Sequence, residues 1–152
     1  MLTSAAEWLA DAGVRRWAAG EAYPWINTLH LLGLVMLVGG IGVVDLRVAG
    51  AWRALPAAAL SRALTPVAMV GLVISTVTGV LLFAADGAAL AESETFRTKL
   101  LLIGLVLTNA IIFRTLWRDR IDRPPLPARL AAVASLLLWL GVATLGRLIA
   151  YS

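Results

Sequence analysis

Four blocks of nearly continuous apolar residues run along the chain, separated by short stretches rich in charge, glycine or proline. A helix needs about 20 apolar residues to cross a hydrocarbon core of roughly 30 Å. The pattern therefore predicts membrane-spanning helices over about residues 23–44, 66–85, 96–116 and 126–150. Prolines stand near the starts of the first, second and fourth blocks, where a helix tolerates them. The predicted fold is all-α: an integral membrane four-helix bundle, formed by a single transmembrane domain over residues 1–152.

The segment before the first block differs from a signal peptide. It carries Glu7, Asp11 and Glu21 and has no continuous apolar stretch. Ser4 and Glu7 have the spacing of a capping box, which is typical of a helix start. The apolar residues that follow can share one helical face; they are Trp8, Leu9, Ala12 and Trp17. We expect a short helix in the membrane interface, with a solvated N-terminus as the alternative.

Composition agrees with the membrane assignment and excludes several classes of site. Apolar residues make up 61% of the chain and charged residues 14%, whereas a soluble domain carries about a quarter charged. Cysteine is absent, which excludes disulfides, iron–sulfur clusters, thiolate metal sites and covalently attached heme. The single histidine excludes a multi-histidine metal site within one chain.

The net charge of +4 is concentrated in the connections between the apolar blocks. The connection after the first block holds Arg47, Arg53 and Arg62, and the one after the third holds Arg118, Arg120, Arg123 and Arg129. By the positive-inside rule these two connections are cytoplasmic. Both termini and an acidic loop with Asp86, Glu92 and Glu94 then face outwards. Because the basic residues serve topology, we expect the lipid bilayer as the partner and no nucleic acid.

Small residues in the first two spans indicate close helix packing. Span one contains Gly33, Gly39, Gly40 and Gly42, and span two contains Gly71, Ser75 and Gly79 at four-residue spacing. Small residues at that spacing let helix backbones approach one another in lipid. A tight bundle accounts for them, and a homo-oligomer is also compatible.

Four ionisable residues converge on the outer end of the predicted bundle: His30, Arg97, Lys99 and Arg147. His30 lies seven residues after Tyr23, which places it about 10 Å along the helix. Charged groups within a span are costly and are functional candidates by default. The cations can also be interface anchors, and His30 can be a hydrogen-bonding contact between helices.

The chemistry of this cluster favours a heme site. A neutral imidazole can ligate iron without bringing charge into lipid, so His30 is the candidate axial ligand and the candidate metal-binding residue. Arg97, Arg147 and Lys99 are candidates for holding the propionates of heme b. The sixth ligand could come from Met69, Lys99, another chain or no residue at all.

Other polar residues in the spans have structural interpretations. Asn109, with the hydroxyls of Ser75, Thr76 and Thr78, is expected to join helices. Asp45 and Arg47 are interpreted as a pair that sets topology or as a contact with Arg114.

Several motifs resemble a bacterial family of small four-span membrane proteins of unknown function. They are the run Tyr23-Pro24-Trp25-Ile26-Asn27-Thr28-Leu29-His30, the residues Gly33, Gly40 and Asp45-Leu46-Arg47, the pair Thr78-Gly79 with Phe83, the run Phe96-Arg97-Thr98-Lys99-Leu100-Leu101, and Asn109, Trp139, Gly146-Arg147 and Ala150-Tyr151. The resemblance covers nearly the whole chain and implies a place in the bacterial inner membrane.

The same layout is more distantly similar to HemJ-type protoporphyrinogen oxidases and to the membrane domain of copper-resistance D proteins. In those oxidases a histidine, glycines and an arginine of an early span, and a lysine opening a later span, are functional; His30, Gly33, Gly40, Arg47 and Lys99 occupy comparable places. This likeness implies heme b and porphyrinogen oxidation. The oxidases carry a further histidine where this chain has Asn109 and Ala110.

Three function classes follow, and the sequence leaves the choice between enzyme and non-enzyme open. The first is a heme b protein for electron transfer or heme-linked redox chemistry, working with a membrane redox partner. The second is an enzyme acting on porphyrin-like substrates. The third is a non-catalytic membrane subunit or small transporter, in which the polar cluster serves packing or a partner.

Overall fold

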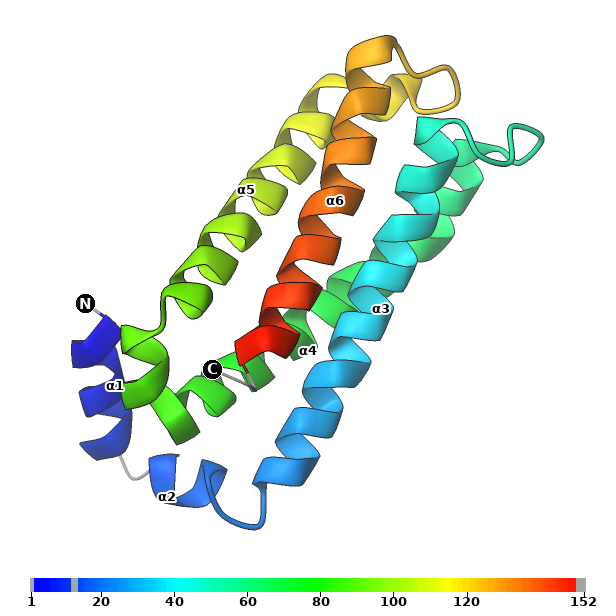
Figure 1. Ribbon diagram of the computed structural model, residues 1–152. Coiled ribbons are helices and arrows are strands. Elements are labelled where there is room, and N and C mark those ends of the chain that lie inside the picture. Colours follow the sequence, from blue (N-terminus) through cyan, green and yellow to red (C-terminus); the bar gives the residue numbers. More distant parts are fainter. Residues whose placement is uncertain (1, 12–13, 150–152) are drawn as a thin grey trace.

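Four long helices run side by side in the computed structural model, which describes residues 2–11 and 14–149 (Figure 1). They are α3 (Tyr23–Ala49), α4 (Ala57–Glu92), α5 (Glu94–Leu116) and α6 (Leu126–Leu148). All four are long and apolar enough to cross a membrane. The described residues contain no strand, so the prediction of an all-α membrane bundle is confirmed.

The short elements lie at the two ends of the bundle (Figure 1). The helices α1 (Leu2–Asp11) and α2 (Val14–Ala18) pack on α4. They lie at the end of the bundle that contains the α4–α5 junction and the end of α6, which we call the cavity end. The opposite, arginine-loop end contains the α3–α4 loop, residues 50–56, and the α5–α6 connection, residues 117–125, with the 3₁₀ helix η1 (Arg118–Arg120). The predicted N-terminal helix is therefore confirmed and is followed by a second one.

The ends of α3 and α6 follow from local sequence. Pro24 stands in the first turn of α3, where no backbone donor is lost. Gly50 ends that helix with φ +129°, and its N–H reaches the carbonyls of Leu46 and Arg47 at 3.1 and 3.2 Å. This conformation favours glycine because a side chain is strained there. The prolines before Leu126 set the start of α6 at the predicted position.

The second span departs from its prediction at both ends. Its helix begins at Ala57 rather than near Pro66, so Pro66 lies inside α4 and Arg62 lies on a helix instead of in a loop. A proline removes one backbone hydrogen bond, and residues 57–65 are mostly helix formers that continue the helix across it. The carboxylate of Asp122 also caps this start, since Ala58 N–H donates to its Oδ1 at 3.0 Å.

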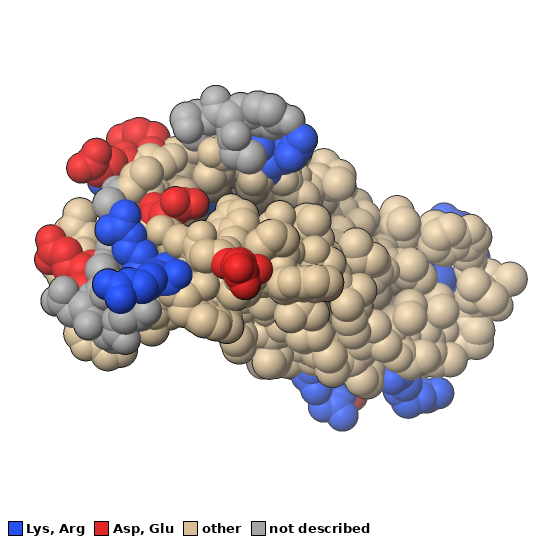
Figure 2. Space-filling view, turned by 90° about the horizontal axis from the view of Figure 1, so that it is seen from below, with Lys and Arg blue, Asp and Glu red and all other residues tan. Residues whose placement is uncertain are grey.

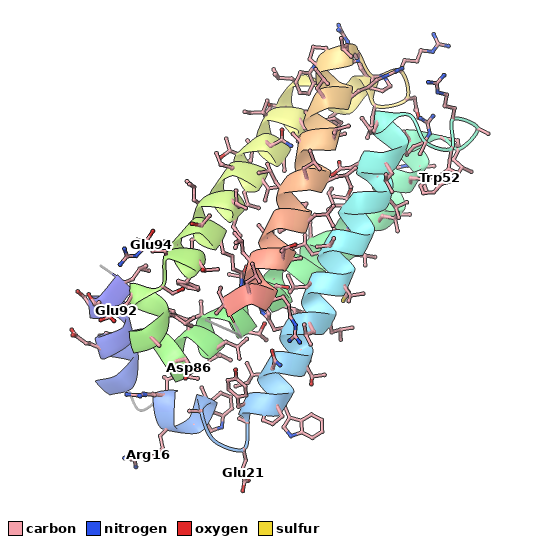
Figure 3. All side chains as sticks on the ribbon, in the orientation of Figure 1. Arg16, Glu21, Trp52, Asp86, Glu92 and Glu94 are labelled. Atoms are coloured by element: carbon pink, nitrogen blue, oxygen red, sulfur yellow. The ribbon has the colours of Figure 1, made fainter. Side chains whose placement is uncertain are left out.

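The predicted acidic loop is a junction between helices. Asp86 leaves helical geometry at φ −122° and ψ 24°, which kinks α4, but the helix continues to Glu92. Only Ser93 then separates α4 from α5, and its Oγ accepts a hydrogen bond from Phe96 N–H at 3.3 Å. The side chains of Asp86, Glu92 and Glu94 still gather at the cavity end, opposite Trp52 at the arginine-loop end (Figure 3).

Helix contacts divide the bundle into two hairpins. The α3–α4 pair has the most extensive contact, with Gly33 and Gly40 of α3 and Gly71 of α4 at it, whereas α5 packs mainly on α6. The α3–α6 contact joins the hairpins through a core around Leu37, Val106 and Trp139. Helices α4 and α5 make few contacts with each other, although they adjoin in sequence. This arrangement leaves space between the hairpins.

The outer surface of the long helices is apolar. Strongly exposed apolar side chains occur on every long helix, and they include Trp25, Val35, Val73, Leu101, Ile111 and Leu137. Viewed towards the cavity end, acidic and basic side chains lie around that end and the remaining surface is largely uncharged (Figure 2). Such a surface fits contact with a lipid bilayer. Trp8 and Trp17 are also exposed, at 69% and 59%.

Candidate functional site

His30 is held in one orientation by two neighbouring residues of α4. Its Nδ1 lies 3.0 Å from Oγ1 of Thr78, and the Thr78 hydroxyl donates its hydrogen to the Ile74 carbonyl at 2.6 Å. Since a hydroxyl has one hydrogen, Thr78 accepts from the Nδ1–H of the imidazole. The ring lies against Gly79, where an added Cβ would be 3.3 Å from Cε1. The lone pair of Nε2 therefore remains available.

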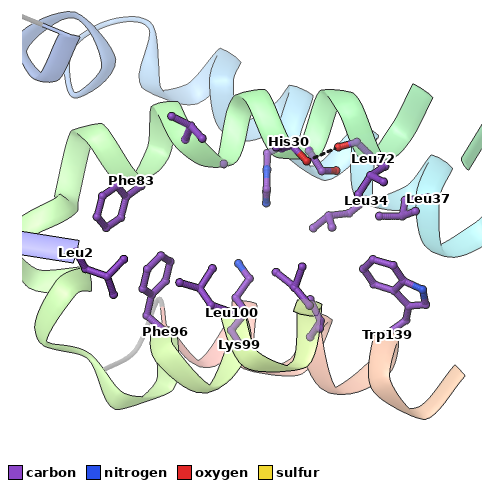
Figure 4. A pocket seen from close by; sticks show the side chains of 16 residues that line it. Leu2, His30, Leu34, Leu37, Leu72, Phe83, Phe96, Lys99, Leu100 and Trp139 are labelled. Carbon is purple, nitrogen blue, oxygen red and sulfur yellow. Dashed lines mark hydrogen bonds between the residues drawn. The ribbon is translucent and has the colours of Figure 1, made fainter. Parts of the chain in front are cut away.

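The imidazole points into a cavity between the two hairpins (Figure 4). Its volume is about 350 Å³, and residues from α1 and all four long helices line it. Most of the lining is apolar, including Leu2, Leu34, Leu37, Leu72, Val80, Phe83, Phe96, Leu100, Ile103, Trp139 and Val142. The polar groups on the walls come from His30, Ser75, Thr76 and Lys99. A few polar groups in an apolar pocket are typical of a ligand site.

Lys99 stands on the wall opposite His30, and its side chain points towards the imidazole (Figure 4). The side chain is half-buried and passes over Gly146 of α6, where an added Cβ would lie 3.5 Å from Nζ. Gly146 thus leaves the room in which the lysine lies. The predicted convergence of His30 and Lys99 is found in the structure.

Ser75 adds an unsatisfied oxygen to the same cavity. Its Oγ is buried and has no hydrogen-bond partner among the described residues. A buried hydroxyl without a partner is costly, so such groups call for an explanation. The oxygen lies against Gly33 of α3, where an added Cβ would be 2.6 Å away, so it is packed in the α3–α4 contact.

Aromatic side chains close the cavity at both ends. The rings of Phe83 and Phe96 stack with centroids 5.5 Å apart and planes 9° apart, near Leu2 of α1 (Figure 4). Trp139 of α6 is 6% exposed and forms the opposite end of the cavity. Sequence reasoning did not select these walls, although both phenylalanines flank the predicted acidic connection.

The two arginines of the predicted cluster lie outside the cavity lining. The Nη2 of Arg97 donates to the Ala91 carbonyl at 3.0 Å, and its Nη1 lies 3.9 Å from Glu94. Arg97 therefore fastens the α4–α5 junction. Arg147 is exposed near the end of α6, one residue after the glycine that Lys99 covers. Both remain at the cavity end, within the same region as His30.

Arg47 has a role that the sequence did not predict. Its Nε donates to the Leu55 carbonyl at 2.5 Å and its Nη2 to the Arg53 carbonyl at 3.2 Å. Arg47 thus fixes the α3–α4 loop, whereas Asp45 and Arg47 were interpreted as a pair that sets topology or as a contact with Arg114. The carboxyl of Asp45 interacts with the side chain of Ser135 on α6 instead.

Two further candidates are placed by the structure. Met69 is 51% exposed and is absent from the cavity lining, so it does not face His30. The amide of Asn109 donates to the Ala131 carbonyl at 3.0 Å, which confirms a hydrogen bond between helices. No group of three or more His, Cys, Asp or Glu able to hold a bare metal ion occurs in the described ranges.

The profile of one protein family matches residues 9–152, nearly the whole chain. The chain belongs to the family of unknown function DUF6644. The predicted membership of a family of unknown function is thereby confirmed. Every cavity residue except Leu2 lies within the part that matches DUF6644. The comparisons found no matching curated protein and no matching solved structure.

Proposed function

We propose that this chain, as a single transmembrane domain, binds heme b in its cavity and serves electron transfer or heme-linked redox chemistry. The observation that carries the proposal is the His30 imidazole, fixed on Nδ1 by Thr78 and aimed into an apolar cavity. Histidines that ligate metals donate their other ring N–H in this way, which fixes the tautomer and strengthens the ligand. Heme b, when bound, supplies one-electron redox chemistry.

The walls of the cavity suit a flat and largely apolar group. Ligand cavities commonly measure roughly 300–1,000 Å³, and this one has about 350 Å³. It is therefore at the small end of the range. The sparse contacts between α4 and α5 leave that side free, so a macrocycle can extend from the cavity towards the lipid.

The cations at the cavity end give partners for the propionates. Lys99 faces His30 across the cavity and can take a carboxylate or act as a sixth ligand through its neutral amine. Arg147 and Arg97 are the further candidates for a carboxylate. Arg97 would exchange its contact with the Ala91 carbonyl for that role, since the guanidinium offers five donors.

The resemblance to HemJ-type oxidases supports the choice of heme and makes porphyrinogen oxidation the second candidate. Lys99 favours that candidate, because a cation opposite His30 can hold a substrate carboxylate. The departure at Asn109 counts against it. Asn109 is bonded to Ala131 and does not line the cavity, so it does not replace the histidine of those oxidases.

We place the protein in the bacterial inner membrane with both arginine-rich connections in the cytoplasm. The heme site then lies in the outer half of the membrane, and the electron partner is a membrane protein or carrier that reaches that half. The asymmetry of the arginines supports this orientation.

Visible spectra of detergent-purified protein, oxidised and reduced with dithionite, test the proposal before and after hemin addition. We expect a Soret band that sharpens on reduction, disappears in His30→Ala and returns with added imidazole. Thr28→Ala is the matched control, because Thr28 lies two residues before His30 on the same helix. Its exposed hydroxyl donates to the Pro24 carbonyl and not to His30. If neither the wild type nor His30→Ala binds heme, the result would favour the non-catalytic subunit or transporter. Porphyrinogen turnover above the His30→Ala rate would favour the enzyme.

A further inference from the structure

A second ionisable group lies deep in the bundle, far from the proposed heme site. Asp45 of α3 is 7% exposed and stands four residues before the end of its helix, at the arginine-loop side. It lies between Val44 and Val48, which belong to a buried apolar cluster. Its Oδ2 has no hydrogen-bond partner among the described residues. An ionised carboxylate in such surroundings is strongly disfavoured.

The arginines of the packed helices do not neutralise this carboxyl. Arg47 of α3 bonds two loop carbonyls, and Arg129 of α6 donates to the Pro124 carbonyl at 3.3 Å. Arg62 of α4 and Arg114 of α5 are exposed. Within the described ranges Asp45 has no ion pair. A proton on the carboxyl is the remaining way to remove its charge.

A short polar path starts at Asp45 and crosses the helices. Its carboxyl interacts with the side chain of Ser135 on α6, which is 5% exposed. Ala131 lies one turn before Ser135, and its carbonyl accepts from the Asn109 amide of α5. Polar groups of α3, α5 and α6 therefore lie one helical turn apart in this half of the bundle.

These polar groups adjoin the floor of the cavity. Trp139 forms that floor and follows Ser135 by four residues, which is about 6 Å along α6. Asp45 thus lies between the cavity and the aqueous phase at the arginine-loop end. His30 lies 15 residues before Asp45 on α3, about 22 Å along the helix. In a medium of low dielectric, a charge beside His30 acts on the carboxyl over that distance.

We propose that Asp45 is a proton-binding site, which, at a pH high enough to ionise its carboxyl, takes up one proton from the arginine-loop side when one electron enters the cavity. The incoming electron adds one negative charge, and protonation of the Asp45 carboxylate removes one, so the charge of the membrane interior is unchanged. An asparagine would make the same helix contact without the cost of a buried acid, whereas a carboxyl can exchange a proton. The coupling to the electron rests on the proposed heme function.

Infrared spectra of the purified protein in H₂O and D₂O test the proton site without any need for heme. We expect the carbonyl band of a protonated carboxylic acid at neutral pH, lost at high pH and shifted by Ser135→Ala. The band should be absent from Asp45→Asn and present in Asp119→Asn, whose carboxyl is exposed at the same end. If Asp45→Asn does not fold, Asp45→Glu replaces it in the assignment: this variant keeps a carboxylic acid and should show the band at a shifted frequency. A wild-type spectrum without the band, or a band unchanged at every pH that preserves the fold, would overturn the proposal.

The coupling is measured on hemin-loaded protein as the pH dependence of its midpoint potential. In wild type and in Asp119→Asn we expect the potential to fall as pH rises through the range in which the infrared band is lost. Most of that slope should be lost in Asp45→Asn. Equal slopes in Asp45→Asn and wild type would refute the coupling. Absence of heme binding would instead refute the proposed function, and the infrared titration would still decide whether Asp45 exchanges its proton.

Discussion

Gly33 of α3 lies directly against Ser75 of α4, so that a Cβ added at Gly33 would be 2.6 Å from the serine Oγ and 2.9 Å from its backbone nitrogen. The two helices therefore touch through their backbones at the level of the cavity. Gly71 repeats the contact one turn away, since its Cβ would lie 2.6 Å from the Gly33 carbonyl. This approach sets the depth at which His30 and Ser75 reach the cavity.

Gly33→Ala should destabilise the bundle by about 1–3 kcal/mol, because the methyl group meets the α4 backbone and the helices must separate. Gly39→Ala is the matched control on α3, since nothing lies within 4 Å of its added Cβ. The stability of Gly39→Ala should equal or slightly exceed that of the wild type, because alanine has a higher helix propensity than glycine. Unfolding in detergent, followed by circular dichroism, measures both. Equal stability of the two variants would contradict the packing at Gly33.

Thr78→Val should weaken hemin binding by roughly 10- to 100-fold, because the imidazole loses the partner that fixes its tautomer and orientation. Thr76→Val removes another hydroxyl from the cavity wall, but that hydroxyl bonds the Leu72 carbonyl and not His30. Its affinity should stay near that of the wild type. Hemin titration followed in the visible spectrum gives both values. Similar losses of affinity in the two variants would mean that the His30–Thr78 hydrogen bond does not contribute specifically to hemin binding.

The bundle itself was predictable from the sequence because the bilayer imposes the length and apolarity of each span. The error at Pro66 has a local cause, since a proline can start a helix or lie within one when good helix formers precede it. At Asp86 the error was the reverse: a loop was predicted where the helix continues. Acidic residues suggest a loop, but here they continue a kinked helix up to Ser93.

The site was predictable only in part. His30 and Lys99 could be placed at one end because charged groups in spans are few and helix rise fixes their depth. Rotation about the helix axes is not fixed by depth. It decides that Lys99 faces the cavity, that Arg97 bonds the Ala91 carbonyl, and that Met69 faces outwards. Thr78 was expected to join helices, and only the structure shows that it joins His30.

Lys99→Met should reduce the preference of the protein for carboxylate-bearing heme. In the wild type we expect hemin to bind about tenfold more tightly than its dimethyl ester, since a charge-assisted contact contributes about 1.5 kcal/mol. Lys99→Met should bind both alike while retaining affinity through His30. Arg97→Gln is the control at the same end, and it should keep the preference because Arg97 already contacts Ala91 and Glu94. Loss of the preference in Arg97→Gln alone would assign the carboxylate to the arginine.

The orientation in the membrane can be tested with single cysteines, because the natural chain has none. Ser4 on α1 and Arg120 on η1 are exposed at opposite ends of the bundle. If the arginine-rich connections are cytoplasmic, a maleimide that does not cross membranes should label Ser4→Cys on intact spheroplasts. Arg120→Cys should react only after permeabilisation. The reverse pattern would place the proposed heme site in the cytoplasmic half, and its electron partner would then have to act from that side.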